Sequence, residues 1–567
     1  MRLPSTNDFI SGVTALSRPG EKTARDLNDG DLGSRLESAA DRNGRLHLVA
    51  PEGETVHLWS DVHEMALAGA NSLKKFGVGR NSIVAIAGKS SIEVVTAVRA
   101  CWMLGAAVMM IALPATRRRN SMVSQRLTDM RATVSPAMVI ADQDVLKSVA
   151  EAFNCPSLSS GEWGRLCLGS RDIEDVHSPV DMRDKSLAVI QFTSGTTGRP
   201  KALAVGAGQL LHNVDASAEG LRLDPSSDVF VSWLPLSHDM GLIGMLAVSM
   251  LHSSDLVLMD TSMFVGNPAT WMESCSSFGG TITAGPSFAY EVATRLLKKD
   301  MEMDLSALRL AVNGAEAISV DGFEGFLKSG VAYGLEPTAA FTVYGLAEAT
   351  LAVTFPLPGV GLESDRVSEA SLEQWTARSV GAEFARSRRL ALLGRPIGGM
   401  EVAIDSGGVR SHGEGVIGEV VVKGDSVVER YSDGGSVKRG NWLYTGDLGY
   451  FRRGQLVVCG RNKDLIVIGG RNLFPSEVER AIGNLVGVHH GQCAAIGVEE
   501  RGTERMAIVA ETEFSADQRA GLEKAIRDAV LDGWDVAVRA IVFVSPGEIP
   551  KTTSGKISRN ACKRLFD

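Results

Sequence analysis

Short apolar segments alternate with longer mixed segments over residues 45–350 of the 567-residue chain. Ser91 to Ala107 has the length and composition of a helix, and Val108 to Leu113 has those of a short buried strand. Three further segments repeat the strand pattern: Val229–Trp233, Asp255–Met259 and Leu308–Val312. Because strands that alternate with helices usually pair in parallel, this region is predicted to be α/β, with ligands at the carboxyl ends of its strands.

The pattern changes after about residue 390, where short strands lie between glycine- and aspartate-rich turns. Three such strands predict a small β-rich subdomain: Glu401–Ile404, Gly418–Lys423 and Gln455–Val458. From Asp464 onward, helices at Pro475–Leu485 and near Ala516–Leu531 predict a compact α+β unit. The chain is also too long for one core, so two or more domains are expected.

Composition narrows the class of partner. A content of 44% hydrophobic and 22% charged residues is that of an ordinary globular protein, and the net charge of −9 disfavours nucleic acid as a partner. The longest uncharged apolar stretch, Ala100 to Leu113, is too short to span a bilayer, so we expect no integral membrane association. The seven cysteines are scattered, and the N-terminus lacks a signal-peptide core. We therefore predict a cytoplasmic protein.

One loop carries residues suited to polyphosphate. It follows the apolar run Leu187–Phe192 and combines glycines, whose backbone N–H groups can approach phosphate, with hydroxyls and a lysine. The candidate phosphate-binding residues are Thr193, Ser194, Gly195, Thr196, Thr197, Gly198 and Lys201. Arg199 and Pro200 separate this loop from the Walker pattern, in which lysine follows glycine and a helix begins. A simple turn between two strands is the alternative interpretation.

Other motifs fail on their context. Gly413–Gly418 matches the dinucleotide pattern G-x-G-x-x-G, but it precedes a predicted strand rather than a helix. The ten histidines show no spacing typical of metal ligands.

Five further groups of residues come after the loop in order. They are Trp233–Gly241, Asn313–Glu316, Val343–Glu348, Tyr444–Tyr450 with Gly460–Leu465, and Pro550–Lys556. Together with 193–201 they resemble the adenylate-forming superfamily of acyl-CoA synthetases, adenylation domains and luciferases, over nearly the whole chain. The resemblance implies an N-terminal adenylation domain over 1–462, with parallel α/β sheets and a β-rich subdomain, and a small mobile α+β domain over 463–567. It also implies ATP and Mg²⁺ as cofactors.

The resemblance assigns roles around the nucleotide. Glu348 would hold Mg²⁺ against phosphate oxygens, although a surface glutamate is the plain alternative. Tyr344, beside Gly345, would stack on adenine or simply pack in the core. Asp447 would accept hydrogen bonds from the ribose, with Arg461 beside it, or merely cap its turn. The adenine edge would be read by Asn313, Gly314, Ala315 and Glu316.

Two lysines near the C-terminus have roles implied by the resemblance. Lys556 would bond the attacking carboxylate and the α-phosphate and offset the charge that develops between two anions. Lys463 matches the hinge position, where backbone freedom matters more than side-chain chemistry. Lys556, Glu348 and Lys201 are therefore the candidate catalytic residues.

Finer details resemble the fatty acyl-AMP ligases. They include Leu234–Gly244, Gly285–Tyr290 and the 43-residue segment 351–393, which is similar to an insertion that lies against the N-terminal domain and hinders use of CoA. An ordinary surface insertion is the alternative. Candidate substrate-binding residues are Trp233, His238, Asp239, Gly241 and Phe288. Ser237 and Ser287 depart from the branch pattern, so the length and substituents of the acyl chain are not predicted.

The branch implies activation of a fatty or related carboxylic acid as acyl-adenylate. Transfer to the phosphopantetheine thiol of an acyl carrier protein would come next. An acyl-CoA synthetase is the alternative enzyme, and a non-catalytic nucleotide- or acyl-binding homologue is the alternative from another class.

Overall fold

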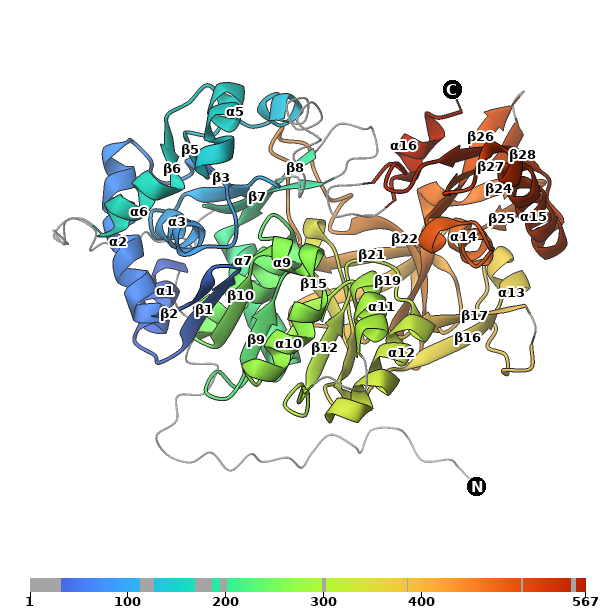
Figure 1. Cartoon of the computed structure of the whole chain (residues 1–567), viewed down its shortest axis with the longest axis horizontal. Coiled ribbons are helices and arrows are strands. Elements are labelled where there is room, and N and C mark those ends of the chain that lie inside the picture. Colours follow the sequence, from blue (N-terminus) through green and yellow to red (C-terminus); the bar gives the residue numbers. More distant parts are fainter. Residues whose placement is uncertain are drawn as a thin grey trace.

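The computed structural model describes residues 32–112, 127–168, 186–193, 201–297, 302–384, 386–500, 503–551 and 557–566. It is a mixed α/β structure with parallel sheets, as predicted. Figure 1 shows the blue and green N-terminal half on one side and the orange and red C-terminal elements on the other.

The central sheet has seven strands in the order β13-β12-β11-β9-β10-β1-β2. Its strands are β1 (Arg45–Ala50), β2 (Gly53–Leu58), β9 (Val229–Ser232), β10 (Asp255–Met259), β11 (Ile282–Gly285), β12 (Leu310–Asn313) and β13 (Ala340–Thr342). All neighbours pair in parallel except β1 and β2. The carboxyl ends of β9, β11, β12 and β13 therefore lie at one edge, where four of the predicted site segments begin.

A second sheet has six strands in the order β6-β5-β3-β4-β7-β8. Its strands are β3 (Ile83–Ala87), β4 (Ala107–Met110), β5 (Met138–Ala141), β6 (Ser157–Ser159), β7 (Leu187–Thr193) and β8 (Lys201–Gly206). Only β7 and β8 are antiparallel, and their register places Thr193 opposite Lys201. The two ends of the predicted phosphate loop are therefore adjacent.

Helices cover these sheets, and most of them pack into one large apolar core, whereas the helix over 143–153 packs on the second sheet in a separate apolar cluster. They are α1 (Leu32–Ala40), α2 (Trp59–Lys75), α3 (Ile92–Met103), α5 (Gln143–Phe153), α6 (Ser160–Leu168), α7 (Ala207–Gly220), α8 (Val248–His252), α9 (Thr261–Gly266), α10 (Ala269–Ser277), α11 (Ser287–Leu296) and α12 (Val320–Gly330). Shorter turns are the π-helix η3 (Met240–Ala247) and the 3₁₀ helices η4 (Val331–Tyr333), η5 (Pro337–Ala339) and η6 (Ala347–Ala349).

The predicted β-rich subdomain is a five-stranded antiparallel sheet in the order β20-β19-β21-β22-β23. Its strands are β19 (Met400–Ser406), β20 (Val409–Ser411), β21 (Gly418–Gly424), β22 (Leu443–Arg452) and β23 (Gln455–Arg461). Before it come β14 (Tyr344–Gly345), β15 (Ala352–Phe355), β18 (Arg395–Pro396) and the β16–β17 hairpin, formed by β16 (Ser364–Ser368), α13 (Glu369–Glu373) and β17 (Ser387–Ala391). Gly413–Gly418 leads into β21, which supports the rejection of a dinucleotide motif.

The C-terminal elements form an α+β unit with a core of their own. That core runs from Ile466 to Val538 and shares no residue with the large core, which ends at Val428. Its elements are η7 (Asn462–Asp464), β24 (Ile466–Ile468), β25 (Arg471–Leu473), α14 (Pro475–Gly483), η8 (His489–Gly491), β26 (Cys493–Glu500), β27 (Thr503–Glu511), α15 (Ala516–Trp534), β28 (Val538–Val544) and α16 (Arg559–Lys563). Figure 1 shows this unit beside the yellow β16–β17 hairpin.

Some predicted boundaries shift for local reasons. The helix expected over Ser91–Ala107 ends at Met103, because Gly105 adopts a left-handed conformation with φ of 68° and turns the chain into β4. Strand β10 coincides with the prediction. Across the described ranges, every helix is too short or too polar to cross a membrane.

Candidate active site

A tyrosine, an aspartate and an arginine from three strands meet beside the β-rich sheet. The Tyr344 hydroxyl donates to Asp447 Oδ2 at 2.8 Å, and Arg461 Nε donates to Asp447 Oδ1 at 2.6 Å. Burial and the adjacent Asp447 carboxylate raise the pKa of the Tyr344 hydroxyl well above its usual value. A carboxylate has about four acceptor positions, so Asp447 can still accept bonds from a diol such as ribose. Arg461 lies beside Asp447 as expected, and Tyr344 joins the pair.

Glu348 lies on η6, close to this cluster. Burial raises the pKa of its carboxyl, and the charges of Asp239 and Asp447 act in the same direction against that of Arg461. A half-buried carboxylate in a locally negative field is a favourable place for a hard cation, which would relieve both burial and repulsion. The oxygen donors therefore fit Mg²⁺, although no group of three or more ligand side chains is found among the described residues.

The chain turns sharply just after Glu348. Thr350 has φ of 69° and ψ of −58°, and the Leu351 N–H donates to the Ala349 carbonyl at 2.9 Å. This is the strained form of the γ-turn, which persists only where the surroundings hold it. The Thr350 hydroxyl donates to the Ser426 carbonyl at 2.7 Å and supplies part of that support.

The buried side-chain amide of Asn213 provides the rest of the support for this turn. Asn213 on α7 is fully buried, and its Nδ2 donates to the carbonyls of Ala349 at 3.3 Å and Ala352 at 2.9 Å. Its Oδ1 accepts from the Ala352 N–H at 3.0 Å. The backbone that carries Glu348 is thus tied to a helix of the large core.

Lys201 contacts an aromatic ring that the motifs did not include. Its ammonium lies 4.8 Å from the centre of the Tyr431 ring. Tyr431 is brought there because the backbone of 430–432 bonds along β8, where the Ser432 N–H donates to the Ala202 carbonyl at 2.8 Å. The Val428 N–H donates to the Glu348 carbonyl at 2.9 Å, so the same segment also reaches the candidate metal ligand.

The segment predicted to bind substrate follows β9. His238 Nδ1 and Asp239 Oδ1 are 2.8 Å apart, and Gln191 Nε2 on β7 donates to the Ser237 carbonyl at 3.2 Å. Gly241 is the second residue of η3, and an added Cβ there would lie 2.4 Å from the Pro235 carbonyl oxygen, so only glycine fits. Trp233 is buried and stacks on Phe264 at 3.6 Å, so its ring belongs to the core in this structure.

The predicted adenine-reading segment lies at the end of β12. Asn313 is fully buried, and its Oδ1 accepts from the Ser287 hydroxyl at 3.2 Å. Ala315 has φ of 68°, a strained value for a residue with a side chain. Glu316 accepts from the N–H of Phe288, whose ring is 45% exposed. Phe288 is therefore the most open of the predicted substrate-binding side chains, and a role for Asn313 at adenine stays a prediction.

The family model for AMP-binding enzymes matches residues 36–432. The chain is an AMP-binding enzyme.

Among its relatives, the long-chain-fatty-acid–AMP ligase FadD26 of Mycobacterium bovis is 30% identical, over 90% of this chain and 91% of that protein. The medium-chain-fatty-acid–[acyl-carrier-protein] ligase JamA of Moorena producens is 29% identical, over 90% of this chain and 89% of that protein. A solved structure from a study of fatty acyl-adenylate ligases of E. coli and L. pneumophila is 28% identical, with a TM-score of 0.87 over 95% of this chain and 98% of that one. The predicted membership of the adenylate-forming superfamily, with likeness to its fatty acyl-AMP ligases, is confirmed.

Several predicted residues of this AMP-binding enzyme lie outside the described part: Ser194, Gly195, Thr196, Thr197, Gly198 and Lys556. Lys463 is exposed in η7. The next residue, Asp464, accepts from Arg559 Nη1 at 3.0 Å, and Arg559 Nε donates to Glu479 at 2.8 Å. The predicted hinge is thus bonded to the helix that comes after the Lys556 segment.

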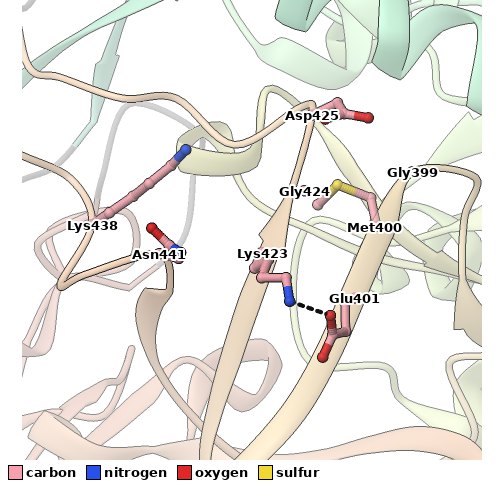
Figure 2. A pocket seen from close by; sticks show the side chains of 8 residues that line it. All are labelled: Gly399, Met400, Glu401, Lys423, Gly424, Asp425, Lys438 and Asn441. Carbon is pink, nitrogen blue, oxygen red and sulfur yellow. Dashed lines mark ion pairs between the residues drawn. The ribbon is translucent and has the colours of Figure 1, made fainter.

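A hollow of about 520 Å³ on the β-rich sheet does not belong to this site. Figure 2 shows Lys423 bonded to Glu401 across neighbouring strands, with Lys438 and Asn441 on the facing loop and Asp425 at the rim. The two lysines are balanced by two carboxylates, so the hollow gives no excess charge that would select a nucleotide.

The inserted segment contacts both parts of the chain. Arg389 on β17 donates to Asp321 at 2.7 Å and to Glu324 at 3.0 Å, both on α12. Glu373 on α13 accepts from Arg471 of the C-terminal unit at 3.0 Å. The expectation placed this insertion only against the N-terminal domain.

Proposed function

We propose that this AMP-binding enzyme joins a fatty or related carboxylic acid to AMP at the expense of ATP, and then passes the acyl group to an acyl carrier protein. The observation that carries the proposal is the meeting of Glu348, Asp447, Arg461 and Tyr344 from separate motifs, with Lys201 linked to them through the 428–432 segment. The names of the relatives FadD26 and JamA support the fatty acid and the carrier protein respectively.

In the first step the chain mainly positions two anions. Asp447 accepts hydrogen bonds from the ribose hydroxyls, while the 193–198 loop and Lys201 bind the phosphates that leave. Glu348 would hold Mg²⁺, which would neutralise charge on those phosphates. A carboxylate oxygen of the acid forms a bond to the α-phosphorus, and the bond to the bridging oxygen of pyrophosphate breaks. No general base is needed, because the acid is already ionised at neutral pH.

Lys556 is the residue that would act at the new bond. Its charge offsets the repulsion between the incoming carboxylate and the α-phosphate, and this effect is typically worth several kcal/mol of barrier. In the second step the thiol sulfur of phosphopantetheine bonds to the acyl carbon, the bond to AMP breaks, and the thiol proton passes to solvent.

We place the domain boundary at Lys463, between an adenylation domain over 1–462 and a mobile domain over 463–567. The separate C-terminal core supports this division. Lys463 belongs to neither the large core nor the C-terminal core, so rotation about it would leave both intact and would separate only the smaller apolar cluster in which Phe474 packs on the β-rich sheet. The contacts of the β16–β17 hairpin with both parts support a carrier protein rather than free CoA as acceptor, since the hairpin restrains the position of the C-terminal unit.

The test is Lys556→Ala. We expect acyl-AMP formation to fall on the order of 10²- to 10³-fold with an unchanged melting temperature, measured by pyrophosphate release with a panel of fatty acids. Lys551→Ala is the control, because Lys551 is exposed at the start of the same segment. Unchanged pyrophosphate release would refute the assignment, and mass spectrometry showing efficient acyl-CoA formation with free CoA would refute the acceptor.

A further inference from the structure

The 428–432 segment connects the two charged groups expected to meet the phosphates of ATP. At one end the Val428 N–H bonds to the carbonyl of Glu348, and at the other Tyr431 forms an antiparallel bridge with Leu203 on β8. Strand β8 begins at Lys201. The segment therefore fixes the distance between the lysine strand and the glutamate turn through backbone bonds.

The side chain of Tyr431 adds a direct contact to this connection. The Lys201 ammonium lies over its ring at 4.8 Å, within the range of a cation–π interaction. Within the described ranges Lys201 makes no ion pair with a carboxylate. The ring thus stands where Lys147, Lys328 and Lys423 each have a carboxylate partner.

Lys423 shows the contrast. Its ammonium also lies near an aromatic ring, 5.0 Å from Trp442, but it pairs with Glu401 at 2.6 Å. A carboxylate partner cancels the charge of an ammonium and uses its N–H donors. The face of a ring attracts the charge and leaves the donors available for a ligand.

The surroundings of Tyr431 also define what its hydroxyl does. Burial raises the pKa of this hydroxyl, and the charges of Glu348 and Asp433 add to the effect. The hydroxyl therefore stays protonated at neutral pH and does not act as a base. The part of Tyr431 that can act on the site is therefore its ring, which lies near Glu348 and under the ammonium of Lys201.

We infer that Tyr431 is a positioning residue that holds the Lys201 ammonium ready for the leaving phosphates of ATP. The inference rests on the proposed function, because it needs Lys201 to bind those phosphates. The ring limits the many rotamers of the lysine before ATP arrives, so less conformational entropy is lost on binding. The ring does not neutralise the Lys201 ammonium, so its charge stays available to the phosphates of ATP.

The role of the Tyr431 ring is tested by measuring the ATP affinity of the full chain. The measurement is calorimetry with MgATP and no fatty acid. Tyr431→Leu removes it and should weaken ATP binding roughly tenfold, which corresponds to about 1.4 kcal/mol. The KM for fatty acid should change little. Tyr431→Phe keeps the ring and should bind ATP within about twofold of wild type.

Trp442→Leu is the matched control, because it removes an aromatic ring from a lysine outside the site. It should leave ATP affinity unchanged. Equal weakening by Tyr431→Leu and Trp442→Leu would overturn the inference, as would normal ATP binding by Tyr431→Leu.

A double-mutant cycle with Lys201→Met decides whether Tyr431 acts through the lysine. If it does, Tyr431→Leu should cause no further loss of ATP affinity once Lys201 is replaced. An equal loss in both backgrounds would overturn the inference. If wild type fails to bind MgATP, or Lys201→Met binds it normally, the proposed function itself fails, so the two failures are distinguishable.

Discussion

The turn that carries Glu348 and the interface of the β16–β17 hairpin with the C-terminal unit are held by opposite means. The turn is fixed by backbone carbonyls and N–H groups bonded to the fully buried Asn213. Ion pairs cross the interface: Arg471–Glu373 at 3.0 Å, Arg480–Glu369 at 3.5 Å and Arg388–Glu477 at 3.6 Å. Phe474 of the C-terminal unit also packs there in an apolar cluster with the hairpin and the β-rich sheet.

The difference matches what each region has to do. A buried amide with all its bonds satisfied strongly opposes displacement, because its bonds cannot be replaced by water without unfolding. The arginines of two of the ion pairs, Arg471 and Arg480, are partly exposed, and such pairs exchange easily with water and are individually weak. The first arrangement suits the proposed role of Glu348 in holding a cation, and the second suits the proposed movement of the C-terminal unit between the two reaction steps.

The largest effect is expected at the turn that carries Glu348. Asn213→Ala removes the side chain that bonds Ala349 and Ala352, and leaves buried backbone groups without partners. We expect the free energy of unfolding to fall by about 2–4 kcal/mol, measured by urea denaturation, together with a loss of adenylation.

Ser217→Ala is the matched control. Ser217 lies on the same helix and is buried, but its hydroxyl has no hydrogen-bond partner among the described residues, so its removal breaks none. Its effect should stay within about 0.5 kcal/mol. Similar losses for the two variants would show that the turn is not held by Asn213.

Much of this rigid region could be predicted from the sequence, but its support could not. The apolar runs located β9, β10 and β12, and parallel pairing brings the carboxyl ends of such strands to one edge, near the Glu348 motif. Asp447 and Arg461 lie on antiparallel strands, and the resemblance of their motifs located them. Asn213 carries no local signal. It acts on residues 136 and 139 positions away, so only the packing of α7 under the turn reveals it.

Tyr431 was missed for a similar reason. Its stretch, Tyr431–Gly435, is rich in glycine and aspartate and looks like an ordinary turn in the sequence. Its role depends on a bridge to β8, and such long-range pairing is set by tertiary structure rather than by local pattern. The ion pairs of the hairpin could not be foreseen either, since charged positions in a surface insertion carry no periodicity.

The next largest effect is a pH dependence of stability, which arises at the interface between the β16–β17 hairpin and the C-terminal unit. Burial is the main cause that raises the pKa of Glu477 to about 7 from an ordinary value of 4.5, and the Arg388 charge only partly offsets it. The folded state therefore holds this proton while the unfolded state releases it. The contribution of Glu477 to the free energy of unfolding is fully present below about pH 4.5. It is lost as pH rises through about 7, and the loss amounts to about 3 kcal/mol.

Glu477→Gln removes this titration. Its melting temperature should exceed that of wild type by an amount that grows between pH 5 and pH 7 and then stays constant. Parallel melting profiles for the two proteins would contradict the assignment of this pH dependence to Glu477.

The smallest effect is expected at the rim of the same interface. Glu373→Gln weakens the two-point bond with Arg471, whose side chain is 36% exposed, but leaves the bond from Arg471 to the Trp534 carbonyl. Such a pair is worth less than about 1 kcal/mol, so amide exchange in β25 should rise by at most about fivefold, with no measurable change in melting temperature. Glu363→Gln is the control, because Glu363 lies on the same insertion but bonds Arg453 and Gln455 instead. A large fall in melting temperature for Glu373→Gln would mean that the interface is as rigid as the Glu348 turn, and the C-terminal unit could then not rotate between the two steps without a much higher barrier.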